Sequence, residues 1–208
     1  DLHLLWKPYP NFIGEEPTLE ANYDWTRVDE VVANAVAAGT EIFVRIGNNK
    51  NEGWSPQTGT TFCDPNLVLN NPPNDFAVFG QVVKHIMMHI SDGWDSGTFV
   101  PFNYLEVWNE FYIPWWWTGT GVEAAQLYEA VYAACKPSYP NTQFLPSINT
   151  PYNSNLVSRD FWNYVLANGT HIDGVAPHLY ATHPYRIEER VYSSATDKSW
   201  EDLFADVG

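Results

Sequence analysis

Basic residues are scarce in this sequence, and their scarcity limits the partners it can have. Its 208 residues include 10 Lys and Arg against 25 Asp and Glu, a formal net charge of −15 at pH 7. Because like charges repel, this balance argues against nucleic acid and anionic lipid as partners. It fits a secreted, soluble protein that acts on a neutral or cationic substrate, although a solvated acidic surface is the more common reason for such a charge.

Long apolar runs are also missing, so no segment is expected to span a membrane. No glycine-rich phosphate fingerprint follows any predicted strand; dinucleotide and P-loop folds therefore have no support, and no cofactor is expected. The two cysteines, Cys63 and Cys135, allow one disulfide at most, and the sequence does not show whether they meet. The abrupt start at Asp1 suggests a mature or excised beginning. The glycosylation pattern at Asn168 is a weak signal, because chance matches are common.

Aromatic residues, by contrast, are abundant. The sequence has 10 Trp, 12 Tyr and 11 Phe, which make 16% of the chain, with only 17% charged residues. Some of them fill a core, yet Trp at this density also suits a cleft that stacks flat apolar faces such as those of sugar rings. Trp115, Trp116 and Trp117 follow one another and cannot all point into one core. At least one of them is expected to line or cover a site, unless they fold onto an outer rim.

Predicted strands and helices alternate along the chain. Short apolar runs predict strands, and apolar residues three and four apart predict helices. The expected strands cover residues 1–5, 41–47, 104–110, 142–148 and 172–180. Four helices are expected. The first starts at a cap on Asp24 or Thr26 and stops at Gly39, and the second covers 76–90. The third runs from 122 to before Pro137, and the fourth covers 159–166. This alternation implies a parallel sheet with crossover helices.

Polar residues gather where these strands end. They are Arg45, Asn48, Asn109, Glu110, Asn149, His178 and Tyr180. A (β/α)8 barrel, the TIM barrel, keeps its chemistry at the carboxyl ends of its strands, so this distribution predicts such an α/β barrel. Considered alone, the Asn-Glu that closes 104–110 is more typical of a strand running into an ordinary solvated loop.

Three stretches carry a resemblance to a known group of enzymes. They are Glu106-Val107-Trp108-Asn109-Glu110, the strand Phe43-Val44-Arg45-Ile46-Gly47 behind a Tyr23-Asp24-Trp25…Asp29 helix opening, and His178-Leu179-Tyr180. Together they resemble clan A glycoside hydrolases, most closely family 39, the β-xylosidase and α-L-iduronidase group. The likeness follows the order of the elements over most of the chain and is strongest around the first stretch.

The resemblance implies roles for individual residues. In that clan a Trp-Asn-Glu at the end of barrel strand four supplies the general acid/base, which matches Glu110. The Asn beside it, matched by Asn109, hydrogen-bonds the sugar 2-hydroxyl. The His-x-Tyr of strand six matches His178 and Tyr180, with the tyrosine near the nucleophile. Pro usually follows Trp-Asn-Glu in the family; Phe111 stands there instead, which affects the expected loop geometry more than the chemistry.

The family's second carboxylate has no match. Its nucleophile is a Glu at the end of strand seven, and no predicted strand ending in Glu follows Tyr180. By the likeness, residues 1–208 are a partial catalytic barrel that holds strands two to six and lacks the first strand and the last two. Such a piece would have two sheet edges with unpaired backbone groups. The remainder of the barrel is therefore expected in a longer polypeptide or in another part of the enzyme.

The main hypothesis is therefore a retaining glycosidase that acts on an oligosaccharide, a polysaccharide or a glycoside. Glu110 must keep its proton near neutral pH, which an apolar wall of Trp108, Phe111 and 115–117 would favour. The first alternative is a non-catalytic carbohydrate-binding barrel that has lost the strand-seven Glu. The second is an endo-acting clan A hydrolase on a plant or algal polysaccharide. A strand ending in Glu soon after Gly208 would favour an enzyme.

Arg45 lies inside a predicted strand, where a charge needs a partner. Strand alternation puts Glu106, Trp108 and Glu110 on one side, with Glu106 deeper, so an ion pair between Arg45 and Glu106 beneath the site is expected. In the alternative, Arg45 reaches up to orient the nucleophile. Arg45 therefore joins Asn109, His178, Tyr180, Trp115 and Trp116 in the set of expected substrate-binding residues.

Four further polar residues, two of which form a pair, are open to two interpretations. His85 and His89 lie four apart on a helix, a spacing that can hold a metal, but a half-buried structural pair is favoured and no metal is expected. Asp173 begins a predicted strand, where a structural role is favoured. His183 either touches substrate from a loop or is solvated.

Overall fold

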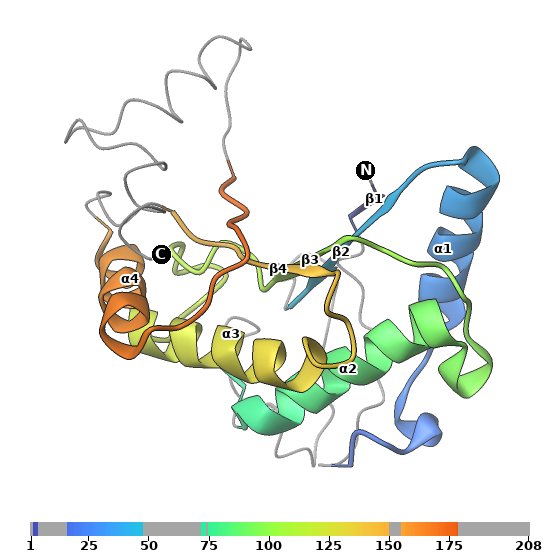
Figure 1. The fold of residues 1–208 in the computed structure, drawn as a ribbon, viewed down its shortest axis with the longest axis horizontal. Helices are drawn as coiled ribbons and strands as arrows, with labels where there is room; N and C mark the ends of the chain where they lie inside the picture. The colour runs from blue at the N-terminus through green and yellow to red at the C-terminus, as the bar shows by residue number, and fades with distance from the viewer. Residues whose placement is uncertain (1, 4–15, 48–71, 74, 150–154, 179–208) are drawn as a thin grey trace, which may run out of the picture.

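The computed structural model describes residues 2–3, 16–47, 72–73, 75–149 and 155–178. Within these ranges, four parallel strands form one sheet in chain order (Figure 1). They are β1 (Leu2–His3), β2 (Ile42–Ile46), β3 (Tyr104–Val107) and β4 (Gln143–Pro146). Parallel neighbours need long crossover connections, and the chain supplies a helix between each pair. The predicted parallel α/β architecture is confirmed for the described part of the chain.

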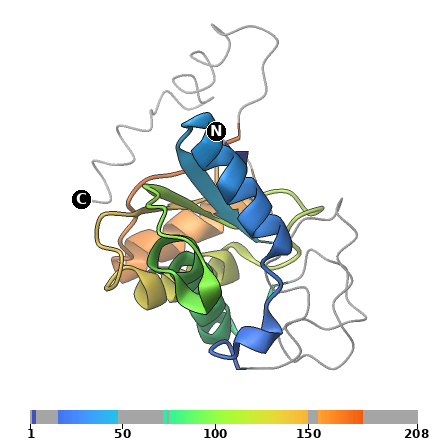
Figure 2. The same ribbon diagram turned by 90° about the vertical axis from the view of Figure 1, so that its right-hand side faces the viewer.

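Four α-helices accompany the sheet. They are α1 (Thr26–Ala38), α2 (Phe76–Asp92), α3 (Gly121–Cys135) and α4 (Leu156–Asn168), with short 3-10 turns η1 (Glu20–Asn22) and η3 (Trp94–Ser96). In Figure 1, α2 and α3 run beneath the sheet, with α1 on the right and α4 on the left. The turned view in Figure 2 shows α2, α3 and α4 next to one another, in keeping with the contacts of α3 with both its neighbours.

Side-chain caps fix where most of these helices begin. Thr120 and Glu123 form a reciprocal capping box at the start of α3, and Asp75 accepts from the Val78 N–H at the start of α2. Such caps satisfy N–H groups that have no partner inside the helix. The start predicted for α4 was three residues late because the cap is Asn155. The N-cap of α1 is Trp25, which makes no such bond, but the predicted Asp24 lies one residue earlier and its side chain accepts from the Thr26 N–H at 3.1 Å.

The helix-facing side of the sheet is apolar. Side chains alternate between the two faces of a strand. Those on the helix side are buried and belong to the core formed with the helices: Ile42, Val44, Ile46, Leu105, Val107 and Phe144. Full burial of each such side chain contributes about 1.5–3 kcal/mol relative to exposure. This face therefore supplies most of the apolar area that the sheet buries.

The opposite face carries two rows of different character. Register places Phe43, Tyr104 and Gln143 in one row, and Arg45, Glu106 and Leu145 in the next row toward the strand ends. The first row is partly exposed, and the second is buried. The charged pair therefore lies one layer below the residues that follow the strands.

The described part of the predicted last strand, residues 172–178, is not a strand. It joins β4 through the Ala176 N–H, which donates to the Pro146 carbonyl at 3.1 Å. The Phe144 N–H of β4 instead donates to the Asp173 side chain, at 2.9 Å. Pro177 has no N–H to offer a ladder. The side-chain bond therefore replaces a backbone bond of the kind that a regular strand would make, and Asp173 has the structural role that was favoured.

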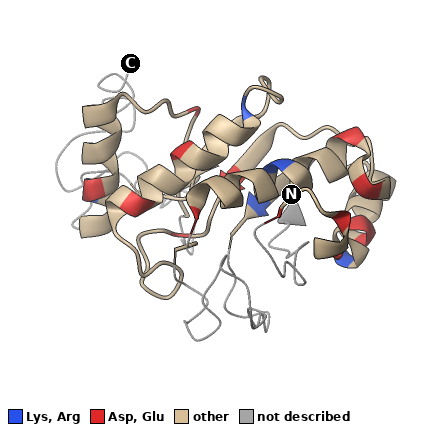
Figure 3. Ribbon diagram, turned by 90° about the horizontal axis from the view of Figure 1, so that it is seen from below, with Lys and Arg blue, Asp and Glu red and all other residues tan. Residues whose placement is uncertain are grey.

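Acidic residues are distributed over several helices of the described chain, with few basic residues among them (Figure 3). No helix in the described ranges is long and apolar enough to cross a bilayer. Cys135 is a free thiol buried beneath α2, and Cys63 lies outside the described residues.

Candidate active site

Three strands end side by side. Register aligns Ile46 of β2 with Val107 of β3, and Val107 with Pro146 of β4. The residues that come directly after them, Gly47, Trp108 and Ser147, therefore meet at one edge of the sheet. This is the carboxyl edge, where α/β barrels carry their chemistry.

The chain turns sharply as soon as β3 ends. Trp108 has φ +69° and Glu110 has φ +46°, left-handed conformations that non-glycine residues rarely adopt. Such conformations cost of order 1–3 kcal/mol and cluster at functional sites. Gly47 makes room for the turn, because a Cβ there would lie 2.7 Å from the Trp108 Cα.

The turn ends the alternation of side chains along β3. Trp108 swings into the core, where its ring packs against Phe79, Phe111 and Trp117. The prediction that Trp108 shares a face with Glu106 and Glu110 is therefore wrong. Trp108 and Phe111 lie in this aromatic cluster of the core, so they do not form the expected wall of an open site around Glu110.

Ser147 holds the turn from the neighbouring strand. Its hydroxyl accepts from the Glu110 N–H at 2.9 Å, and its carbonyl accepts from the Phe111 N–H at 3.0 Å. Proline at position 111 could not donate the second bond. Sequence reasoning missed Ser147, although it stands beside Asn149 at the same strand end. Asn149 itself accepts from the Trp162 indole through its carbonyl, which ties it to α4.

A buried charged cluster lies below Glu110. Arg45 Nε donates to Glu106 Oε2 at 2.7 Å, which confirms the predicted ion pair. Arg45 Nη1 also donates to Asn109 Oδ1 at 2.8 Å. His178 Nε2 lies 2.9 Å from Glu106 Oε1, and its Nδ1 lies 3.1 Å from Glu110 Oε1. The structure thus brings together four of the predicted site residues, Arg45, Asn109, Glu110 and His178, around Glu106.

The surroundings of His178 shift its pKa. Burial opposes its protonation, but the hydrogen bond and charge of Glu106, with a further contribution from Glu110, outweigh burial and the repulsion of Arg45. The net effect raises the pKa of His178 above its ordinary value. A protonated His178 has an N–H for each of the two carboxylates it faces.

Tyr112 is a second residue that sequence reasoning missed. Its hydroxyl donates to Glu110 Oε1 at 3.2 Å, the same oxygen that faces His178. Its carbonyl accepts from Asn155 Nδ2 at 2.7 Å, which links the loop after β3 to the start of α4. No periodic pattern predicts either contact. The only signal was its position two residues after the expected acid/base.

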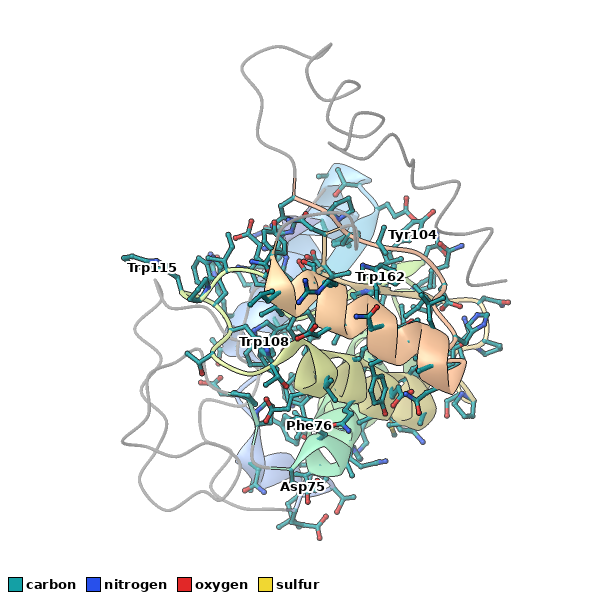
Figure 4. The ribbon with its side chains drawn as sticks, turned by 90° about the vertical axis from the view of Figure 1, so that its left-hand side faces the viewer. Asp75, Phe76, Tyr104, Trp108, Trp115 and Trp162 are labelled. Atoms are coloured by element: carbon teal, nitrogen blue, oxygen red, sulfur yellow. The ribbon has the colours of Figure 1, made fainter. Side chains whose placement is uncertain are left out.

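The three consecutive tryptophans have three different environments. Trp115 is 66% exposed and projects away from the fold (Figure 4). Trp116 is half-buried, and its carbonyl accepts from the Trp108 indole at 2.8 Å. Trp117 is buried edge-on against Trp108 and Phe111. The expectation that they cannot share one core is confirmed, and Trp115 is the one most open to a ligand.

The histidine pair on α2 is structural. His85 Nδ1 faces the Gln81 carbonyl, and His89 lies between the Trp94 carbonyl and Asp29. Trp25 stacks on the His89 ring at a centroid distance of 3.8 Å. In the described ranges no group of three or more His, Cys, Asp and Glu side chains is arranged to hold a metal. Tyr180, His183 and Asn48 lie outside the described residues.

The fold defined by these elements is one that solved glycosidases share. The chain is similar to a glucosidase from Croceicoccus marinus, at 21% identity and a TM-score of 0.63 over 79% of this chain and 32% of that one. It is also similar to the GH39 enzyme from Xanthomonas axonopodis pv. citri, at 22% identity and a TM-score of 0.53 over 76% and 30%.

A monomeric beta-xylosidase from Caulobacter crescentus CB15 matches at 17% identity and a TM-score of 0.51, over 76% of this chain and 31% of that one. The chain therefore spans about a third of the length of each of these structures. No protein-family model and no curated protein matches the sequence. At the level of fold, the likeness bears out the predicted resemblance to family 39 glycosidases.

Proposed function

We propose that this chain is the central part of a (β/α)8 glycosidase that acts with retention, and that Glu110 is its general acid/base. The observation that carries the proposal is the place of the Glu110 carboxyl. It lies at the carboxyl edge of a parallel sheet, 5% exposed, 3.1 Å from His178 and above a buried ion pair. A carboxyl group placed there, in a fold shared with glycosidases, suits proton transfer to a glycosidic oxygen.

Retaining hydrolysis uses one carboxyl group twice. It first protonates the leaving oxygen while a second carboxylate attacks the anomeric carbon, and it then takes a proton from the incoming water. The two carboxyl groups stand about 5–5.5 Å apart in such enzymes. In the proposal, the nucleophile is a Glu at the end of strand seven, one of the strands outside residues 1–208 that complete the barrel.

The charged cluster supports this double use. The charges of Arg45 and Glu106 neutralise each other. The contact between His178 Nδ1 and Glu110 Oε1 needs one proton, which lies between two atoms that can each accept it. That proton can reside on Glu110 or on His178 without a change in the net charge of the four groups. Keeping net charge constant avoids leaving an uncompensated buried charge in either state.

Neighbouring residues have complementary roles in the proposal. Asn109 accepts from Arg45 through Oδ1, so its NH2 group is the end of the amide that would donate to a sugar 2-hydroxyl. Trp115 and Trp116 would stack against a sugar ring or an aglycone. Tyr180 would lie near the nucleophile, as in the family. The substrate is then an oligosaccharide, a polysaccharide or a glycoside, and the acidic composition fits a secreted protein.

A second candidate is a carbohydrate-binding protein without catalysis. It keeps the same cluster and aromatic loop but lacks a nucleophile at the end of strand seven. The full-length sequence distinguishes the two, because a strand that ends in Glu a few dozen residues after Gly208 favours the enzyme. The left-handed turn at Glu110 favours the enzyme as well, since a binding protein has less need of strain at a carboxyl group.

The proposed role of Glu110 is tested by Glu110→Gln in the full-length polypeptide, with a series of glycosides whose leaving groups differ in basicity. General acid catalysis contributes about 10²- to 10⁴-fold. We expect a loss of activity in that range for substrates with poor leaving groups. The loss should be much smaller for activated aryl glycosides, because their aryl groups leave without protonation. Equal losses across the series would contradict the assignment.

A further inference from the structure

Two side chains converge on one oxygen of Glu110. The Tyr112 hydroxyl lies 3.2 Å from Oε1, and His178 Nδ1 lies 3.1 Å from the same atom. The charged groups around this point are Arg45 on β2, Glu106 on β3 and His178 in the segment after α4. Hydrogen bonds of catalytic groups are often long in unliganded structures and shorten when substrate binds.

Tyr112 is held in place from a different element. Asn155 donates through Nδ2 to the Tyr112 carbonyl at 2.7 Å, while its Oδ1 accepts from the Ser158 N–H at 3.2 Å and caps α4. The amide of Asn155 is thus oriented at both ends. On the other side of Tyr112, the Ile113 N–H donates to the Glu110 carbonyl at 2.8 Å and closes a turn. These bonds fix the backbone from which the tyrosine ring reaches Glu110.

We propose that Tyr112 is a positioning residue for the acid/base and decides which partner holds the proton shared by Glu110 and His178. A hydroxyl that donates to a carboxylate stabilises its charged form. Tyr112 therefore favours the state with ionised Glu110 and protonated His178. Asn155 has the second role of placing Tyr112 while it caps α4. This inference rests on the proposed function for its catalytic consequence but not for the proton position itself.

The direction in which the shared proton moves follows from the chemistry of Glu110 and His178. Removal of the Tyr112 hydroxyl takes a stabilising donor from the carboxylate, so the proton moves toward Glu110. The descending limb of the pH profile for glycoside cleavage, which reports loss of the acid's proton, then moves to higher pH. The titration midpoint of His178 moves to lower pH. One lost hydrogen bond corresponds to a shift of about 0.5–1 pH unit.

The test uses Tyr112→Phe in the full-length polypeptide, labelled with ¹⁵N-histidine. The His178 signals are assigned by their loss in His178→Gln. We expect the His178 midpoint of Tyr112→Phe to fall by about 0.5–1 pH unit. An unchanged midpoint overturns the proposal whatever the activity. A fall in the midpoint without movement of the activity profile supports the proton position and contradicts the proposed function, so the two failures are distinguishable.

A second variant separates positioning from folding. Asn155→Ser keeps a good helix cap without adding a charge, but it loses the amide donor to the Tyr112 carbonyl. We expect it to shift the His178 midpoint in the same direction as Tyr112→Phe, by a smaller amount. Its melting temperature should change no more than a conservative exchange of cap residues allows. A midpoint identical to that of the unaltered protein would overturn the role of Asn155.

Discussion

Arg45 and Glu106 lie opposite each other at the same register position of two neighbouring parallel strands, with Arg45 Nε donating to Glu106 Oε2 at 2.7 Å. Both side chains are almost completely enclosed. The other oxygen of the Glu106 carboxylate lies 2.9 Å from His178 Nε2, so each of its oxygens faces a basic side chain. The pair therefore lies beneath Asn109 and Glu110, and its removal would disturb the carboxyl edge of the sheet.

The first prediction concerns the contribution of this ion pair to stability. Arg45→Leu leaves Glu106 buried without its main counter-charge and leaves Asn109 without its donor. Breaking a buried pair in this way costs about 3–5 kcal/mol. Denaturant unfolding of the full-length polypeptide measures the loss. The control is Arg27→Leu, because Arg27 forms an exposed pair with Glu30 that is worth at most about 1 kcal/mol. Similar small losses in both variants would contradict a structural role of the ion pair.

The second prediction concerns pH. The pKa of folded His178 is raised above its ordinary value of 6.5, so its protonation stabilises the fold fully below about 6.5 and this contribution disappears as pH rises through the folded-state value. We therefore expect the difference in unfolding free energy between the unaltered protein and His178→Gln to be largest near the lower end of the range pH 6–9 and to shrink toward its upper end. A difference that grows with pH would mean that the shift has the opposite sign.

The third prediction explains the departure from the family motif at Phe111. The Phe111 ring is completely buried, and its N–H donates to Ser147. Phe111→Pro removes the ring from the core and the donor from the turn, and we expect it to destabilise the full-length protein by about 3 kcal/mol or more. Phe111→Leu keeps the N–H and most of the apolar volume, so it is the matched control. Thermal unfolding compares the two variants: we expect the lower melting temperature for Phe111→Pro, and equal melting temperatures would show that the bond to Ser147 contributes nothing.

The fourth prediction separates two neighbouring tryptophans. Trp115 is exposed, so Trp115→Ala is expected to change the unfolding free energy by less than about 0.5 kcal/mol. If Trp115 stacks on a sugar, the same change raises KM by about three- to tenfold. Trp117→Ala opens a cavity in the aromatic cluster and is expected to cost about 3–5 kcal/mol. A Trp115→Ala enzyme with unaltered KM for every substrate would remove Trp115 from the proposed binding residues.

The spacing of apolar residues predicted the helices and strands of the described chain well where each element buries one face at regular intervals. The strand expected at 41–47 is observed at 42–46, and the helix expected at 76–90 is observed at 76–92. Gly39 ends α1 with φ +64°, as a glycine stop should. The segment 172–178 was predicted as a strand and is not one. Its apolar residues fit a strand. However, the Asp173 side chain accepts from the N–H of Phe144, 29 positions away, in place of a backbone ladder bond.

The candidate site shows the same division. The Arg45–Glu106 pair was predicted, because a charge within an apolar strand needs a partner and the adjacent strand offered one. Ser147 and Tyr112 were missed, because their roles depend on the left-handed turn at Trp108 and Glu110 rather than on any spacing. Strict alternation also misplaced Trp108, since it assumed that the strand continued past Val107.

The sequence by itself determined the parallel α/β class and the acidic character, because periodicity and charge are local properties, and its resemblance to a known family made Glu110 the candidate acid/base. Only the tertiary structure decided which groups surround that carboxyl. A hydroxyl from the residue directly after β4, an imidazole from the segment after α4 and a phenol anchored by the α4 cap converge on Glu110 beyond the end of β3. Such convergence depends on the registers of separate strands and on one strained turn, and no stretch of sequence holds that information alone.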